Sequence, residues 1–288
     1  MELFQYPYMQ RALIGALVIG LAAPALGIYL VQRRLALIGD GVGHVALTGV
    51  GAGLLFNQSP VLAAVIAATL GAVTIELVRA RGRTSGDLAL ALLFYGGIAG
   101  GVMLVGLSDS TSANLNTYLF GALTTISPTD LTTIAVLGAT ITVVMLALRP
   151  ALFAVCHDEE YARVSGLPVR TLNLLLAVAT AVTVTIAMRA VGVLLISALM
   201  VVPVATAQQV TRGFLSTMGA AMTLGLFAAG GGVWVAANAD TAPGASVVLL
   251  AIASFLVVAV LGGLWRVVRR RNTPDPTPVA EPSEVVLR

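Results

Sequence analysis

The sequence predicts an all-α polytopic membrane protein with eight to nine transmembrane helices. Hydrophobic residues make up 58% of the 288-residue chain, charged residues make up 10%, and the mean hydropathy is +0.97. A soluble domain carries about 25% charged residues, so a chain this apolar needs lipid as its solvent. The apolar runs have helical length and only 6% of residues are aromatic, which favours helical spans over barrel strands.

Nine apolar segments qualify as spans, because each approaches the ~20 residues needed to cross the hydrocarbon core. They lie at residues 12–31, 41–57, 60–78, 88–107, 131–148, 171–188, 190–211, 217–237 and 246–265. The second is short and rich in glycine. The seventh contains Gly192 and Pro203, which predict a kink or a break. Eight crossings with one re-entrant segment fit the same pattern.

The basic residues, which are all arginines, predict the orientation. With nine crossings most of them fall on one side of the membrane: Arg33, Arg34, Arg79, Arg81, Arg83, Arg149, Arg163, Arg170, Arg212, Arg266, Arg269, Arg270 and Arg271. An excess of arginine marks the cytoplasmic side. We therefore expect the N-terminus outside and the C-terminus in the cytoplasm. This distribution also accounts for the net charge of +3 without a nucleic-acid partner.

The segments predict one transmembrane domain over residues 1–271. Residues 149–170 form its largest charged loop, on the cytoplasmic side. Residues 272–288 are rich in proline and have little apolar surface to bury, so we expect a disordered cytoplasmic tail.

Two ionisable residues stand inside the apolar stretch "LALIGDGVGHVAL", residues 35–47. Asp40 and His44 are four positions apart and therefore share one face of a helix. A charged aspartate in the membrane costs about 2.5–3.5 kcal/mol on insertion scales, so it needs a partner or a function. Three interpretations remain open. Asp40 caps the helix while His44 bonds a carbonyl, the pair relays protons, or the pair binds a metal ion.

For a metal ion the pair is half of a site. Carboxylate and imidazole ligands together suit Zn²⁺ or Mn²⁺ in four-coordinate geometry. A two-fold dimer with this face at its axis would supply two aspartates and two histidines.

Two absent motifs limit the possible functions. The chain has no G-x-x-x-x-G-K-[ST] sequence, so it binds no ATP through a P-loop, and it has no H-E-x-x-H sequence of a metalloprotease. These absences argue against a P-loop ATPase and against a metalloprotease of the H-E-x-x-H class.

Several longer stretches carry a family resemblance. They are "YPYMQRALIGALVIGLAAPALGIYLVQRRLALIGDGVGHVAL" (6–47), "GDLALALLFYGGIAGGVML" (86–104), "NTYLFGALTTIS" (116–127), "HDEEYARVSGLPVRTLNLLL" (157–176), "RAVGVLLISALMVVPVATAQ" (189–208) and "PGASVVL" (243–249). In this order they resemble the permease subunits of ABC-type zinc/manganese importers, over most of residues 6–262.

The resemblance implies a permease that moves a divalent transition-metal ion, Zn²⁺ or Mn²⁺, into a bacterium across its plasma membrane. It implies a homodimer, a separate cytoplasmic ATP-binding subunit, an extracytoplasmic metal-binding protein, and no permanently bound cofactor. Asp40 and His44 match the family's D-x-x-x-H pair, which lines the metal path. Permeases for iron-siderophore or cobalamin complexes, and proton-driven secondary transporters, are the alternatives. The ligand set does not separate zinc from manganese or iron.

The resemblance also assigns a coupling helix to the 157–170 segment, which would dock into the ATPase. Its expected docking residues are Asp158, Glu159, Glu160, Tyr161, Ala162 and Gly166. A solvated loop, whose acids balance Arg163 and Arg170, is the other interpretation of the charges alone. Pro203 and Arg189 are candidate gating residues; the alternatives are a packing kink at Pro203 and an Arg189 that snorkels to the interface.

Overall fold

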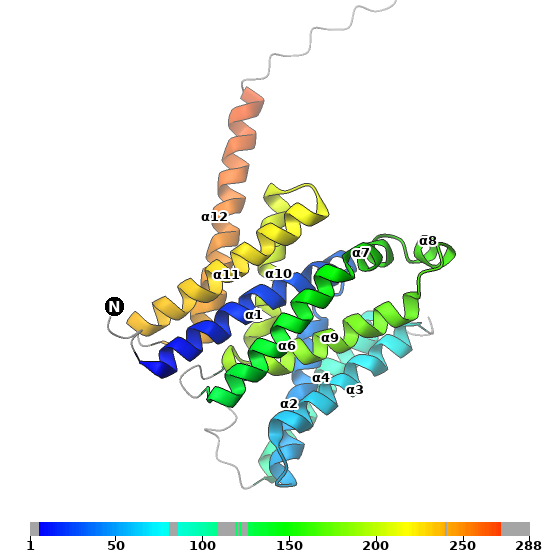
Figure 1. The fold of residues 1–288 in the computed structure, drawn as a ribbon, viewed down its shortest axis with the longest axis vertical. Helices are drawn as coiled ribbons and strands as arrows, with labels where there is room; N and C mark the ends of the chain where they lie inside the picture. Colours follow the sequence, from blue (N-terminus) through cyan, green and yellow to red (C-terminus); the bar gives the residue numbers. More distant parts are fainter. Residues whose placement is uncertain are drawn as a thin grey trace, which may run out of the picture.

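The computed structural model describes residues 6–80, 86–108, 119, 121, 126–239 and 241–271, and this part of the chain is almost entirely helical (Figure 1). Its helices are α1 (Pro7–Gln32), α2 (Ile38–Leu55), α3 (Pro60–Ala80), α4 (Gly86–Leu107), α6 (Pro128–Ala147), α7 (Arg149–His157), α8 (Glu159–Val164), α9 (Val169–Ala190), α10 (Val193–Val210), α11 (Phe214–Ala239) and α12 (Pro243–Arg271). The predicted all-α class is confirmed. The predicted tail, residues 272–288, lies outside the described residues.

Eight of the described helices are long and apolar enough to cross a membrane: α1, α2, α3, α4, α6, α9, α11 and α12. The shorter α10 contains a further apolar segment, Leu195–Val210. The predicted number of eight to nine spans therefore agrees with the structure. The predicted seventh segment, 190–211, breaks at Gly192, which has φ 96 and lies between α9 and α10. Glycine adopts this left-handed conformation without steric cost.

The charged loop at 149–170 contains two short helices rather than one. α6 ends at Ala147 and α7 begins two residues later, with Pro150 in its first turn. Proline lacks the N–H that a continuing helix needs and disfavours helical geometry in the residue before it. α8 then begins at a cap, because the Asp158 side chain accepts a hydrogen bond from the Tyr161 amide at 2.9 Å.

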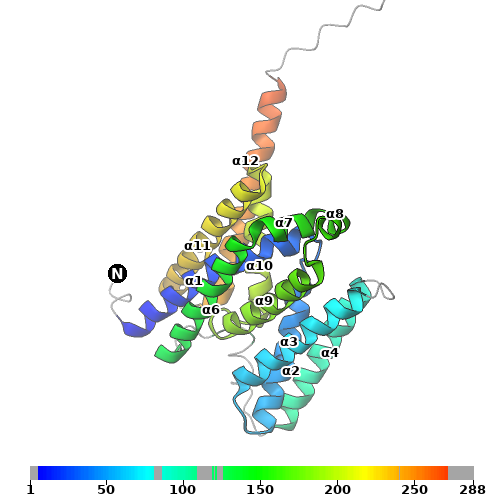
Figure 2. The same ribbon diagram turned by 45° about the vertical axis from the view of Figure 1, so that its right-hand side comes forward.

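Burial separates central from peripheral helices. In their apolar windows 72% of α1, 67% of α2 and 72% of α9 is buried, against 17% of α4 and of α12. Figures 1 and 2 show α2, α3 and α4 side by side, while α12 projects beyond the other helices. The other neighbours of α2 are α9 and α10. α2 is therefore held from several sides.

Glycines let the neighbours of α2 approach its backbone. A Cβ atom at Gly97 of α4 would lie 2.7 Å from the carbonyl carbon of His44, and one at Gly49 would lie 2.5 Å from the backbone of α3. On the α10 side, a Cβ atom at Gly39 would lie 3.4 Å from Ser197. These contacts set the position of the α2 segment that carries Asp40 and His44.

The helix ends that the arginine pattern assigns to the cytoplasm lie together. The Tyr29 ring, near the end of α1, packs on Phe214 at the start of α11 with ring centroids 5.5 Å apart. Phe214 also contacts Phe153 of α7 at 4.9 Å. The Tyr29 hydroxyl donates to the Met145 carbonyl of α6 at 2.8 Å. These ends therefore lie on one side of the protein, while their assignment to the cytoplasm stays a prediction.

Replacing Gly97 by alanine is expected to destabilise the protein by about 1–3 kcal/mol, because the new methyl group overlaps the backbone of α2. The adjacent Gly96 is a matched control, since a Cβ atom there meets nothing within 4 Å. Thermal unfolding in detergent should show a lower midpoint for Gly97→Ala and an unchanged or higher one for Gly96→Ala. Equal midpoints would contradict the close approach of α4 to α2.

Candidate functional site

Asp40 and His44 both lie on α2, one helical turn apart, as predicted. Asp40 is in the first turn of α2, but the N-cap position is Leu37 and no side chain caps the helix. Asp40 instead accepts a hydrogen bond from the Ser197 hydroxyl of α10, with 2.5 Å between the oxygens. The structure therefore does not place Asp40 in the capping role that the sequence left open. Its carboxylate is held by a different helix.

His44 has an unused ring nitrogen. The side chain is buried, with 6% of its surface exposed, and Nδ1 has no hydrogen-bond partner among the described residues. The ring packs edge-on against Phe94 of α4, with centroids 4.5 Å apart. A buried polar atom without a partner costs about 1–3 kcal/mol. Nδ1 is thus a nitrogen available for a proton, a water molecule or a metal ion.

A cavity of about 360 Å³ adjoins Asp40. Its lining comes from α4 and the start of α2: Leu37, Asp40, Leu90, Ala91, Phe94 and Tyr95. Leu37 is 64% exposed and Tyr95 is 70% exposed, so the cavity opens at the surface of the protomer. Its walls are apolar except at Asp40 and the Tyr95 hydroxyl. Asp40 is therefore accessible to a small ligand in apolar surroundings.

The described part of one protomer holds no complete cluster of metal-ligating side chains. In the described ranges no three residues among His, Cys, Asp and Glu come together. Cys156, the one cysteine of the chain, lies in α7 and is within 3.8 Å of the Tyr29 carbonyl oxygen. Burial raises the pKa of its thiol to about 11, so the thiol is protonated near neutral pH.

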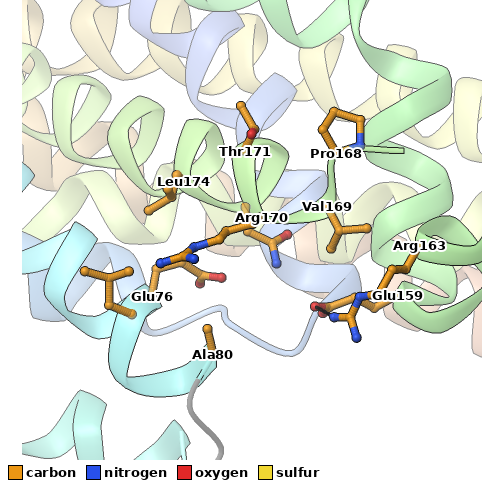
Figure 3. A pocket seen from close by; sticks show the side chains of 11 residues that line it. Glu76, Ala80, Glu159, Arg163, Pro168, Val169, Arg170, Thr171 and Leu174 are labelled. Atoms are coloured by element: carbon orange, nitrogen blue, oxygen red, sulfur yellow. Dashed lines mark ion pairs between the residues drawn. The ribbon is translucent and has the colours of Figure 1, made fainter. Parts of the chain in front are cut away.

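A second polar region lies where α3, α8 and α9 meet. A cavity of about 710 Å³ is lined there by Glu76, Glu159, Arg163 and Arg170 among others. Figure 3 shows Glu76 and Arg170 at one end of it and Glu159 with Arg163 at the other. Glu76 is buried and accepts two hydrogen bonds from Arg79, at 2.8 and 3.0 Å. This pairing compensates a charge inside a predicted span.

The expected docking residues differ in exposure. Asp158 caps α8, Ala162 is fully buried, and Glu159 pairs with Arg33 at 3.4 Å and Arg163 at 3.5 Å. Glu160 and Tyr161 are exposed, and the exposed Gly166 has φ 80. α8 therefore has an inner face that seats it and an outer face open to a partner.

The two candidate gating residues lie on consecutive helices. Pro203 is inside α10. Arg189 is in the last turn of α9, and its side chain lies outside the part of the chain that the structure describes.

Several polar residues at these sites were not predicted. Glu76 had a usable signal, because a charge within the 60–78 span needs a partner. Ser197 had none, since serine is common in transmembrane helices. The sequence marks Arg33 only as one of the charges that predict the orientation, although its side chain is just 6% exposed. Its partner Asn173 is identified only by the packing of α9 against α1.

Comparisons with known proteins confirm the resemblance. The profile of the ABC 3 transport family matches residues 5–262. The high-affinity zinc uptake system membrane protein ZnuB of Haemophilus influenzae is 30% identical, with 85% of this chain and 94% of that protein covered. The manganese transport system membrane protein MntC of Halalkalibacterium halodurans is also 30% identical, with 92% and 93% covered.

A solved structure agrees with these relatives. The structure of PsaBC from Streptococcus pneumoniae in complex with Fab is similar with a TM-score of 0.82 and 28% identity, covering 93% of this chain and 97% of that chain. Together with the apolar helices, these matches confirm the predicted multi-pass bacterial membrane protein. The chain belongs to the ABC 3 transport family.

Proposed function

We propose that the chain is the membrane-spanning permease of an ABC importer and moves a divalent transition-metal ion, zinc or manganese, into the cell. The observation that carries this proposal is the pair on α2, in which an accessible carboxylate and an unpartnered imidazole nitrogen lie one turn apart. The zinc and manganese uptake systems named for its relatives support the choice of substrate.

The transported ion is bound between two copies of the chain. Asp40 and His44 of each copy make up a four-ligand set of two oxygen and two nitrogen donors, which suits Zn²⁺ or Mn²⁺. The support for this arrangement is that one protomer brings together only two such ligands within its described part. The cavity beside Asp40 opens at the protomer surface between Leu37 and Tyr95. This is the face that would adjoin the second copy.

Transport then follows from alternate access to this pair. A metal-binding protein delivers the ion from outside, the ion exchanges water for Asp40 and His44, and inward opening releases it. Energy comes from a separate ATP-binding subunit below the cytoplasmic helix ends. α8 is its docking element, with Glu160, Tyr161 and Val164 on the exposed side; the last two are 67% and 88% exposed.

Asp40→Ala and His44→Ala are each expected to remove bound metal from the purified protein. The wild type should hold about one zinc or manganese ion per dimer, because the two-fold axis completes the ligand set. His157→Ala is the matched control, since His157 is the other histidine of the chain and is exposed. Metal content is measured by elemental analysis across zinc, manganese and iron.

The outcomes separate the alternatives. Metal that survives both α2 substitutions would overturn the assignment of the pair as ligands. A protein that binds no bare ion but binds an iron chelate would be a permease for chelated metals. Uptake that depends on a proton gradient and needs no ATPase would make the pair a proton relay.

Ser197→Ala is expected to weaken metal binding roughly tenfold, as loss of an outer-shell hydrogen bond to a ligand typically does. The metal ion competes with protons for its carboxylate and imidazole ligands, so affinity should fall on acidification. Ser197→Thr keeps the hydroxyl and should retain the wild-type affinity.

Thr206→Val is the control for this series. Thr206 is buried on the same helix. Its hydroxyl donates a hydrogen bond to the Val202 carbonyl of that helix and, within the described chain, does not bond to Asp40. Equal metal affinity of Ser197→Ala and wild type would show that Ser197 does not orient the ligand.

Val164→Glu is expected to reduce co-purification of the ATP-binding subunit roughly tenfold, because it places a charge in the centre of the proposed docking surface. Val210→Glu, at an exposed valine that ends α10, is the residue-matched control and should retain the subunit. Normal retention by Val164→Glu would place the docking surface elsewhere.

A further inference from the structure

Arg33 is a buried charge that joins three separate segments. It is the C-cap residue of α1, and its side chain is only 6% exposed. Its Nη1 donates to the Asn173 side-chain oxygen of α9 at 2.8 Å, and its Nη2 lies 3.4 Å from a carboxylate oxygen of Glu159 in α8. A buried guanidinium needs such partners, because an unpaired charge out of water is costly.

On one side this network leads to α8. The helix packs on α7 and α9, its neighbours in the chain, and Glu159 extends from it to the distant α1–α2 connection. Glu159 also pairs with Arg163, but that arginine is 69% exposed and belongs to the same helix. Of the two ion pairs of Glu159, only the pair with Arg33 therefore connects α8 to a different helix.

On the other side the network leads to the proposed metal ligand. Arg33 begins the short connection into α2, and this connection is tightly bonded: the Leu35 amide donates to the Leu30 carbonyl at 2.8 Å and the Ile38 amide to the Leu35 carbonyl at 3.0 Å. Arg34 has φ 58 within it. Asp40 follows in the first turn of α2. A displacement of Arg33 is therefore transmitted to Asp40 rather than absorbed by a slack loop.

The second partner of Arg33 leads to the same place by another path. Asn173 is 5% exposed and lies near the start of α9. α9 ends at Ala190, and after Gly192 the chain continues as α10, which carries Ser197. Asn173 thus links Arg33 to α9, the helix that precedes the one carrying the hydrogen-bond partner of Asp40.

We propose that Arg33 is a positioning residue that transmits the displacement of α8 to Asp40 and so couples ATP hydrolysis to metal release. This inference rests on the proposed function, in which α8 docks the ATP-binding subunit. Rotation or translation of α8 moves Glu159, Glu159 pulls on Arg33, and the rigid connection carries the movement into the first turn of α2.

The test uses the full importer, permease with ATP-binding subunit, reconstituted in lipid vesicles with zinc or manganese as the transported ion. Arg33→Gln is compared with Arg34→Gln, which removes the same charge from the neighbouring, exposed arginine. Three quantities are measured: retention of the ATP-binding subunit, metal bound by the detergent-purified permease, and metal transported per ATP hydrolysed.

For Arg33→Gln we expect retention and bound metal within about twofold of wild type, and metal transported per ATP reduced roughly tenfold. Arg34→Gln should match wild type in all three. Normal transport per ATP in Arg33→Gln would overturn the proposal. Loss of the ATP-binding subunit in this variant would also overturn it, since Arg33 would then serve docking itself.

If Arg33→Gln does not fold, Arg33→Lys tests the proposal instead. Lysine keeps the buried charge but lacks the planar fork that reaches both partners, so transport per ATP should still fall, and an unchanged ratio would overturn the proposal. Hydrogen exchange gives an independent readout: docking of the subunit should alter exchange at residues 33–40 in wild type and not in Arg33→Lys. If the wild-type complex itself transports no metal, the proposed function fails rather than this inference.

Discussion

The close approach of neighbouring helices to the glycines of α2 is the constraint on which the rest of the structure depends. α4 reaches the backbone at His44 through Gly97, and α10 reaches the first turn through Gly39. In lipid, helices associate through such close packing and through polar contacts, because apolar surface gains little by leaving lipid for protein. The packing brings Ser197 to Asp40 and encloses the His44 ring against Phe94.

The described ionisable side chains between the helices have polar partners, except for one ring nitrogen of His44. Glu76 is paired with Arg79, Arg33 with Asn173 and Glu159, and Asp40 with Ser197. Each partner lowers the cost of holding an ionisable group away from water. The Nδ1 atom of His44 has no such partner within the described chain. In the proposed function, the transported cation is the partner of this nitrogen.

The helix ends around α7 and α8 link the docking step and the metal-release step of the proposed transport cycle. The segment between α6 and α9 is folded into two short helices, α7 and α8. Pro150 explains where α7 begins, and the Asp158 cap explains where α8 begins. Ala162 and Glu159 hold α8 against the body, while Tyr161 and Val164 are left exposed. The position of α8 is thereby linked to the end of α1 and the start of α9. In the proposal, this seating is what lets α8 pass a movement of the ATP-binding subunit to the spans.

The sequence by itself determined the helical membrane class, the spans to within a few residues, and the placement of Asp40 and His44 on one face of one helix. These properties depend on hydropathy and on the 3.6-residue period, both of which are local. Only the tertiary structure decided which helix faces which, and therefore that Ser197 holds Asp40 and that Arg33 meets Asn173 and Glu159. The physical reason is that faces turned to lipid and faces turned to protein are equally apolar, so no amphipathic pattern marks the contact face of a span.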